Sequence, residues 1–196
     1  AIDCGNGIYT FYGLSVTNTG TIQGKAGIRC VGNTVDTVTN SGTIIGTDGT
    51  AINLGNGADT LTLQTGSQIT GTVSGGGGAD ALILDGLGTV NFNVAAFEKL
   101  TKTGLGTWSL TTNFTVTNVA QADVSVDEGV LAVNNTLTVT NGLQANPSGT
   151  LAGTGTVAGN VLNRGTVAPG NSIGVLNIAG NYTQTAAGTL AVEAKG

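Results

Sequence analysis

The last quarter of the chain, Gly149–Glu193, is the segment that most clearly indicates the fold. Its sequence is GTLAGTGTVAGNVLNRGTVAPGNSIGVLNIAGNYTQTAAGTLAVE. A glycine followed by threonine and an apolar residue recurs within it, as at Gly149, Gly165 and Gly188. Between these triplets apolar and polar residues alternate, as in Val175–Ile178, which predicts short half-buried strands separated by glycine and asparagine turns. One strand style repeated about every 15 to 25 residues indicates a stack of coils and not a two-layer globule.

The composition favours an ordered all-β chain. Glycine accounts for 34 of the 196 residues, and charged residues make up only 9%, against about 25% in ordinary soluble domains. Threonine and valine favour extended backbone, while glycine and asparagine favour turns. The net charge is −5 and the six basic residues are scattered, which argues against nucleic acid and anionic lipid as partners. No apolar run reaches about 18 residues, so the sequence predicts no transmembrane helix.

Two sequence blocks recur within residues 1–88. The first block occurs as Val16–Ile22, Val38–Ile44 and Leu63–Ile69, and the second as Ala1–Gly7, Gly27–Asn33 and Ala51–Gly57. Units of about 21 to 27 residues cannot bury an apolar face alone, but stacked units form a continuous core with strands about 4.8 Å apart. The sequence therefore predicts a right-handed parallel β-helix of roughly nine turns.

The predicted organisation is one continuous rod, with regular turns over residues 1–88 and less regular turns with a C-terminal cap over residues 89–196. The chain begins inside a repeat and shows no basic and apolar leader. We therefore expect either a removed signal peptide or an excised fragment, and favour both.

Four segments carry a resemblance to a known family. They are Phe97–Leu110 with the pattern F-E-x-L-x-K-x-G-x-G-T-W-x-L, Gly149–Val157 (GTLAGTGTV), Val167–Ser172 (VAPGNS) and Gly180–Thr183 (GNYT). In this order they resemble the C-terminal part of classical, type Va autotransporter passenger domains, including the autochaperone region. The positions carried over as structural or autochaperone residues are Trp108, Gly153, Gly155, Pro169, Gly170, Asn171 and Ser172.

This resemblance implies a passenger of a Gram-negative bacterium that travels through the periplasm and is displayed at the cell surface or secreted. Such a passenger crosses the outer membrane through a C-terminal β-barrel of the same polypeptide, a partner that would lie outside this sequence. Phe97–Glu193 would fold early, template the other turns, and cover the open edge of the last turn with hairpin-like strands. Family passengers include adhesins, proteases, esterases and toxins, so membership alone does not choose a function.

The two cysteines occupy the same position of the second block. Cys4 and Cys30 align with Leu54 of the third copy, one turn apart. Equivalent positions on adjacent turns lie about 4.8 Å apart, within the Cα separation that a disulfide accepts. We therefore predict a Cys4–Cys30 disulfide, with two buried free thiols as the alternative. An oxidising compartment agrees with secretion.

Three aspartates, Asp36, Asp59 and Asp80, recur at intervals of about one turn and are the weak candidates for a metal site. Gly75–Ile83 and, imperfectly, Leu54–Thr62 fit the nonapeptide of calcium-binding β-rolls. Stacked carboxylates repel, so they either splay into water or share a cation. Because a calcium roll needs tandem nonapeptides, we predict solvated turn aspartates and no metal.

Other conspicuous side chains are also predicted to be structural. The second block aligns three asparagines that we expect to form an amide ladder at a corner: Asn6, Asn33 and Asn56. Trp108 could be a platform for carbohydrate, but its spacing with Leu105 and Leu110 suits burial, so we predict a core residue.

The chain offers little material for catalysis. It contains no histidine, which excludes Ser-His-Asp and Cys-His arrangements within it. A glycan-cleaving β-helix needs clustered carboxylates, for which Asp59, Asp80 and Asp85 are the candidates, while Arg29 and Arg164 sit elsewhere. We therefore predict no catalytic residues, no enzyme activity and no cofactor.

The predicted function is adhesion to a host-cell or matrix component, or a role as a stalk, through side chains and loops on the outer faces. A released effector that binds a specific host receptor and triggers signalling is the first alternative. A polysaccharide-acting β-helix enzyme is the second.

Overall fold

The computed structural model describes residues 5–117, 123–170 and 174–193, and the regular elements in these ranges are β-strands. Parallel strands stack as a β-solenoid of about 8 turns, against the roughly nine predicted. The predicted all-β fold of stacked parallel strands is confirmed. Among the residues that the structure describes, no helix has the length and apolarity that a membrane crossing requires.

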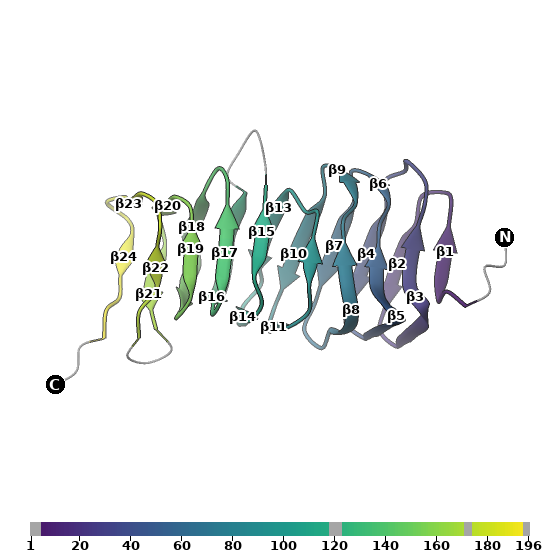
Figure 1. The fold of residues 1–196 in the computed structure, drawn as a ribbon. Helices are drawn as coiled ribbons and strands as arrows, with labels where there is room; N and C mark the ends of the chain where they lie inside the picture. Colours follow the sequence, from purple (N-terminus) through teal and green to yellow (C-terminus); the bar gives the residue numbers. More distant parts are fainter. Residues whose placement is uncertain (1–4, 118–122, 171–173, 194–196) are drawn as a thin grey trace. The chain divides into compact units, whose positions relative to one another are not determined.

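The chain divides into two compact units, each a stack of coils (Figure 1). Unit 1 comprises residues 1–83 and 92–98, and unit 2 comprises residues 84–91 and 99–196. The boundary predicted at residue 88 lies within the short segment 84–91, which packs with unit 2.

Unit 1 contains two runs of parallel strands and one short strand pair. The first run is β1 (Ile8–Thr10), β3 (Thr21–Cys30), β5 (Thr43–Asn53), β8 (Gln68–Ser74) and β12 (Val94–Ala95). The second run is β2 (Ser15–Asn18), β4 (Thr37–Asn40), β7 (Thr60–Leu63) and β10 (Ala81–Asp85), and the short pair is β6 (Asn56–Gly57) with β9 (Gly77–Gly78).

Apolar side chains stack in columns across the turns of unit 1. The strand register pairs Ile28 with Ile52 and Ile52 with Val73, and all three side chains are buried. Each fully buried side chain of this size contributes about 1.5–3 kcal/mol relative to an exposed one. The alternation of strand residues thus places an apolar column inside and leaves hydroxyl and amide groups outside.

Unit 2 repeats this arrangement with three runs of parallel strands. One run is β13 (Lys99–Thr103), β16 (Val124–Val133), β18 (Leu143–Gly153), β20 (Val161–Asn163) and β23 (Tyr182–Gln184). The second consists of β11 (Gly88–Val90) and β14 (Thr107–Leu110) leading to β16, and of β21 (Thr166–Pro169) and β24 (Thr189–Leu190) following β18. The third is β15 (Phe114–Val116), β17 (Thr136–Val139), β19 (Thr156–Ala158) and β22 (Asn177–Ile178).

The last turn of unit 2 corrects the prediction of a hairpin-like cap. β23 pairs in parallel with β20, and β24 pairs in parallel with β21, so these strands continue the coil. Their residues are exposed, and Leu190, which continues the buried column of Leu151 and Val167, is 47% exposed. An open apolar cavity of about 200 Å³ at this end is lined by Val167, Pro169, Leu176, Ile178, Tyr182 and Leu190. The terminal strands keep the alternation of earlier turns, which favours one more parallel coil over a fold-back.

Candidate functional site

Four carboxyl groups form a hydrogen-bonded series in unit 1, which we call the carboxyl ladder: Asp36, Asp59, Asp80 and Glu98. One oxygen of each accepts the backbone N–H of the equivalent residue one turn earlier. The donors are Leu14, Asp36, Asp59 and Asp80, with N···O distances of 2.5, 2.7, 2.8 and 2.7 Å in that order. Asp36, Asp59 and Asp80 each directly precede a strand, namely β4, β7 and β10. The ladder therefore fastens the start of each strand to the next turn.

The prediction that the three aspartates are solvated is wrong. Asp36 is 0% exposed, and Asp59 and Asp80 are each 1% exposed. The backbone N–H of the residue before each strand points to the following turn, and a buried N–H without an acceptor is costly. A carboxyl group at the same corner of that turn supplies the acceptor, which explains why an acidic side chain turns inward there.

The carboxyl ladder contains buried oxygens without hydrogen-bond partners and places acidic groups next to one another. The second oxygen of each aspartate, Oδ2 of Asp36, Asp59 and Asp80, is buried and has no hydrogen-bond partner. Burial raises the pKa of Asp59 to about 6; its bond from the Asp36 N–H opposes this shift, and the charges of Asp80 and Asp36 add to it. Burial also raises the pKa of Asp80, with the charge of Glu98 acting in the same direction.

The weak metal candidates Asp36, Asp59 and Asp80 do not assemble into a cation site. Among the described residues, no group of three or more His, Cys, Asp or Glu side chains could hold a metal ion. One oxygen of each aspartate already accepts a backbone N–H of the neighbouring turn, which leaves a single buried oxygen per residue.

Cys30 lies beside the carboxyl ladder, its side chain is buried, and it forms no disulfide with any residue that the structure describes. Burial raises the pKa of Cys30 to about 12, and the neighbouring Asp36 and Asp59 carboxylates add to that shift. Cys4 lies outside the described residues, so its bridge to Cys30 stays a prediction. Its premise is wrong, however, because the residue in register with Cys30 on the preceding strand is Thr10.

The predicted amide ladder of Asn6, Asn33 and Asn56 is confirmed for one pair only. Asn56 Nδ2 donates to Asn33 Oδ1 at 2.8 Å, and a parallel bridge joins the two residues, which confirms this pair. Asn6 is not aligned with them, since its Oδ1 accepts the backbone N–H of Ala26 at 3.0 Å. A second amide pair, Asn18 and Asn40, is buried in the second run, with Nδ2 and Oδ1 at 2.7 Å.

In unit 2, Trp108 is 1% exposed and belongs to the core, as predicted. Its Nε1–H donates to the Asp85 backbone carbonyl at 3.1 Å, and its six-membered ring packs against Gly88, where a side chain would collide with it. Leu110 is also buried, but the predicted burial of Leu105 is wrong, because that side chain is 77% exposed at a turn.

Lys102 is a functional candidate that sequence reasoning missed. Its side chain is fully buried, and its Nζ donates to the carbonyl oxygens of Thr103 at 2.6 Å, Gly104 at 2.6 Å and Glu128 at 3.1 Å. Burial lowers the pKa of Lys102, while the charges of Asp85 and Glu128 oppose that shift. Alternation would have found it, since Lys102 follows buried Leu100 by two residues in β13.

Glu98 was missed as well. A usable signal exists, because an acidic residue directly precedes five strands: Asp36, Asp59, Asp80, Glu98 and Asp123 stand before β4, β7, β10, β13 and β16. In unit 2, Asp123 is buried and its Oδ2 accepts the backbone N–H of Asn141 at 2.7 Å.

Apart from Trp108 in β14, the described residues carried over from the resemblance lie in or beside β18 and β21 of unit 2. Gly153 pairs with Pro169 in the parallel register and forms an antiparallel bridge with Gly170. Gly153 has φ = 116°, which favours glycine. A side chain on Gly155 would meet the backbone of Asn135. Asn171 and Ser172 lie outside the described residues.

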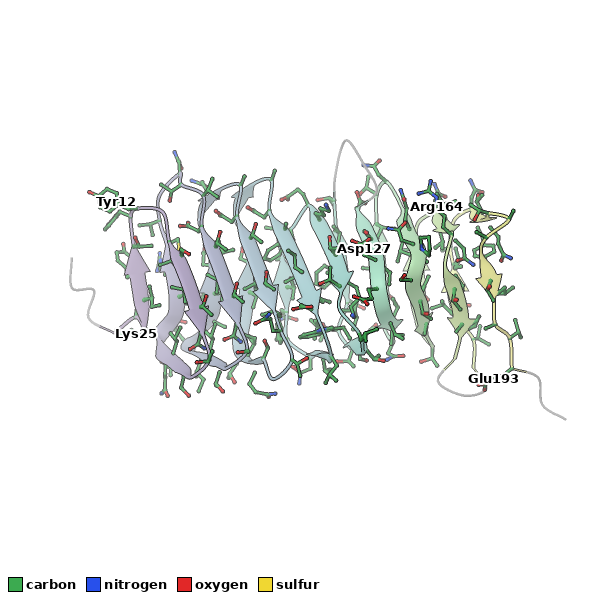
Figure 2. The ribbon with its side chains drawn as sticks, turned by 180° about the vertical axis from the view of Figure 1, so that it is seen from behind. Tyr12, Lys25, Asp127, Arg164 and Glu193 are labelled. Carbon is green, nitrogen blue, oxygen red and sulfur yellow. The ribbon has the colours of Figure 1, made fainter. Side chains whose placement is uncertain are left out.

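The outer surface offers two uncharged regions. On the second run of unit 1, outward side chains form a hydroxyl array of two columns, Ser15, Thr37 and Thr60, and Thr17, Thr39 and Thr62. On unit 2, a shallow groove of about 260 Å³ is lined by amide and hydroxyl side chains that include Asn141, Gln144, Asn160, Asn181 and Thr183. Figure 2 shows Tyr12 and Lys25 on the surface of unit 1 and Arg164 on that of unit 2.

Comparison of the chain with family models, with curated proteins and with solved structures gives no match in any of the three.

Proposed function

We propose that the chain is part of the passenger of a classical autotransporter and acts at the bacterial surface, or after release, as a non-enzymatic stalk or adhesin. The single observation that carries the proposal is the separation of groups in the β-solenoid. Hydroxyl and amide side chains face outward from stacked strands, while the acidic residues that recur turn by turn are buried. The ordered motifs from Phe97 to Thr183 support the choice of family.

Adhesion would use the outer faces. A flat array of hydroxyl groups and a groove lined by amides can exchange hydrogen bonds with a neutral partner such as a matrix component or a host-cell surface molecule. The burial of Asp59 and Asp80 leaves them poorly placed to act on a glycan, which supports a binding role without turnover.

Adhesion is tested with the purified chain on host cells and immobilised matrix. We expect saturable binding without turnover of polysaccharide, and a Thr39→Lys, Thr62→Lys double variant should bind at least about tenfold more weakly, equivalent to about 1.4 kcal/mol. Thr70→Lys, an exposed threonine on β8 of the other run, is the matched control. Absence of saturable binding would leave only the stalk, signalling by treated cells would favour a released effector, and turnover would contradict the non-enzymatic assignment.

We further propose that the segment from Phe97 to Glu193 promotes folding of the passenger during secretion. Its terminal strands continue the parallel register turn by turn, so a folded end can present backbone N–H and C=O groups to the next strand. Deletion of residues 149–196 should lower the refolding yield of the remaining turns far more than deletion of residues 1–42. Equal yields would contradict a nucleating role.

A further inference from the structure

The carboxyl ladder combines two features that a permanently charged series does not tolerate. Its three aspartates are at most 1% exposed, and the Oδ2 atom of each is buried without a hydrogen-bond partner. A buried carboxylate is stable when both oxygens are paired with donors or with a cation. Here each aspartate accepts one backbone N–H, on Oδ1.

The groups around the ladder increase this cost. Asp59 faces Asp36 on one turn and Asp80 on the other, and Asp80 faces Glu98. The titratable group from the neighbouring strand β3 is the Cys30 thiol, which lies beside Asp36. These are all acidic groups, so the charge of one ladder member disfavours the charge of the next.

We propose that the carboxyl ladder binds protons at Asp59 and Asp80 and acts as a pH-sensitive link between the turns of unit 1, which holds when these two groups are protonated and loosens when both are charged. A protonated carboxyl group keeps its acceptor oxygen for the backbone N–H of the preceding turn. It also removes the buried charge from Oδ2. Protonation therefore preserves the bonds that fasten the turns and relieves the repulsion between them.

The sign of the pH dependence follows from the folded state. The pKa of Asp59 is raised from 3.8 to about 6, so between these values the folded chain holds a proton that the unfolded chain has released. Stability therefore falls as pH rises through this interval, and it is recovered on acidification. Asp80, whose pKa is also raised, acts in the same direction. Most folded proteins with paired carboxylates show the opposite dependence.

The experiment compares the whole chain with Asp59→Asn, which is nearly isosteric, neutral at every pH and able to accept the same N–H. Equilibrium urea unfolding is measured between pH 4 and pH 7.5, with hydrogen exchange of the Asp36 and Asp59 backbone amides as the local readout. For the unvaried chain, we expect the unfolding equilibrium constant to rise at least about tenfold across this range, as a shift of one pKa unit requires. The two amides should lose protection in parallel.

Asp59→Asn should flatten this dependence and be more stable than the unvaried chain at pH 7.5. Asp48→Asn changes an exposed carboxyl group of unit 1 whose oxygen accepts the Thr50 N–H, and it should retain the full pH dependence. Infrared spectra of the unvaried chain should show a buried protonated carboxyl band at pH 5 that is lost toward pH 7.5. An unvaried chain that gains stability toward pH 7.5, or that lacks this band, overturns the proposal whether or not the variant folds.

Discussion

Among the described residues, unit 1 buries acidic side chains, whereas unit 2 buries one acid, Asp123, and also a lysine, and each sign of charge pairs with a different backbone group. In unit 1 the buried charged side chains are those of Asp36, Asp59 and Asp80. Their carboxyl groups accept hydrogen bonds from the backbone N–H groups of residues that directly precede strands. In unit 2 the buried Lys102 donates to three backbone carbonyl groups, two of them in strands and one in the bend after β13. Where the backbone hydrogen bonds between strands are interrupted, a backbone N–H or C=O group lacks a partner. The identity of that group determines whether an acidic or a basic side chain can be buried beside it.

The largest effect is expected from Lys102→Met, which keeps the length of the side chain and removes its donors. Three carbonyl groups lose the lysine donor, although the Thr103 carbonyl keeps the backbone N–H of Gly86. Each group left unsatisfied costs about 1–3 kcal/mol, so the loss of unfolding free energy should be about 2 kcal/mol or more. Urea unfolding measures it. Lys99→Met, at an exposed position of the same strand, is the control. A loss of unfolding free energy below about 1 kcal/mol would show that the hydrogen bonds of Lys102 do not stabilise unit 2.

A smaller effect is expected from Asp59→Leu in unit 1. This change removes the acceptor of the Asp36 N–H, and leaving that donor unpaired should cost about 1–3 kcal/mol at pH 5. The matched variant is Asp59→Asn, which retains an acceptor oxygen and should lose much less at that pH. If both variants unfold at the same urea concentration, the ladder oxygens are not what fastens the turns.

Trp108→Phe tests how much stability is lost when a backbone carbonyl group loses a neutral side-chain donor. The shorter phenylalanine ring does not reach Gly88 as the six-membered ring of the indole does, and the Asp85 carbonyl loses the indole N–H. We expect a destabilisation of about 1–2 kcal/mol from the lost hydrogen bond and the space left beside Gly88, less than for Lys102→Met because one hydrogen bond is lost and not three. Thermal unfolding followed by circular dichroism is sufficient, since the native strand signal is unaffected by the change.

The smallest effect is expected from Leu105→Ser. Its side chain is mostly exposed at the turn that contains Gly104, whose carbonyl binds Lys102. The free energy of unfolding should change by no more than about 0.5 kcal/mol. A large loss would show that this turn is held by its apolar side chain and not by the lysine.

The fold was predictable because alternation of apolar and polar residues repeats in nearly every turn. Val38 and Leu61, for example, stand at the same place in TVT and TLT and form one buried column. Trp108 was predictable for the same reason, since a large apolar residue at an inward strand position has few other environments.

The corners were not predictable from pattern alone. Aspartate before a strand is typical of an exposed turn, and the sequence around Asp59 does not show that a backbone N–H one turn earlier lacks an acceptor. The register of the first turn also failed, because Ala1–Gly7 resembles Gly27–Asn33 more closely than Ile8–Thr10 does. The strand pairing nevertheless aligns Ile8–Thr10 with Ile28–Cys30. Alternation does place Lys102 at an inward position two residues after Leu100, but it does not show which backbone carbonyl groups accept its hydrogen bonds.

The direction of the carboxyl ladder has a consequence for how such chains change length. Each turn supplies a donor to the next turn and an acceptor to the previous one, so an inserted turn must bring both to be accommodated. A duplicated segment that starts at one ladder residue and ends before the next, such as residues 36–58, meets this condition automatically. Duplication of whole segments would therefore preserve the hydrogen bond at every corner, whereas a shorter insertion would leave one backbone N–H without an acceptor.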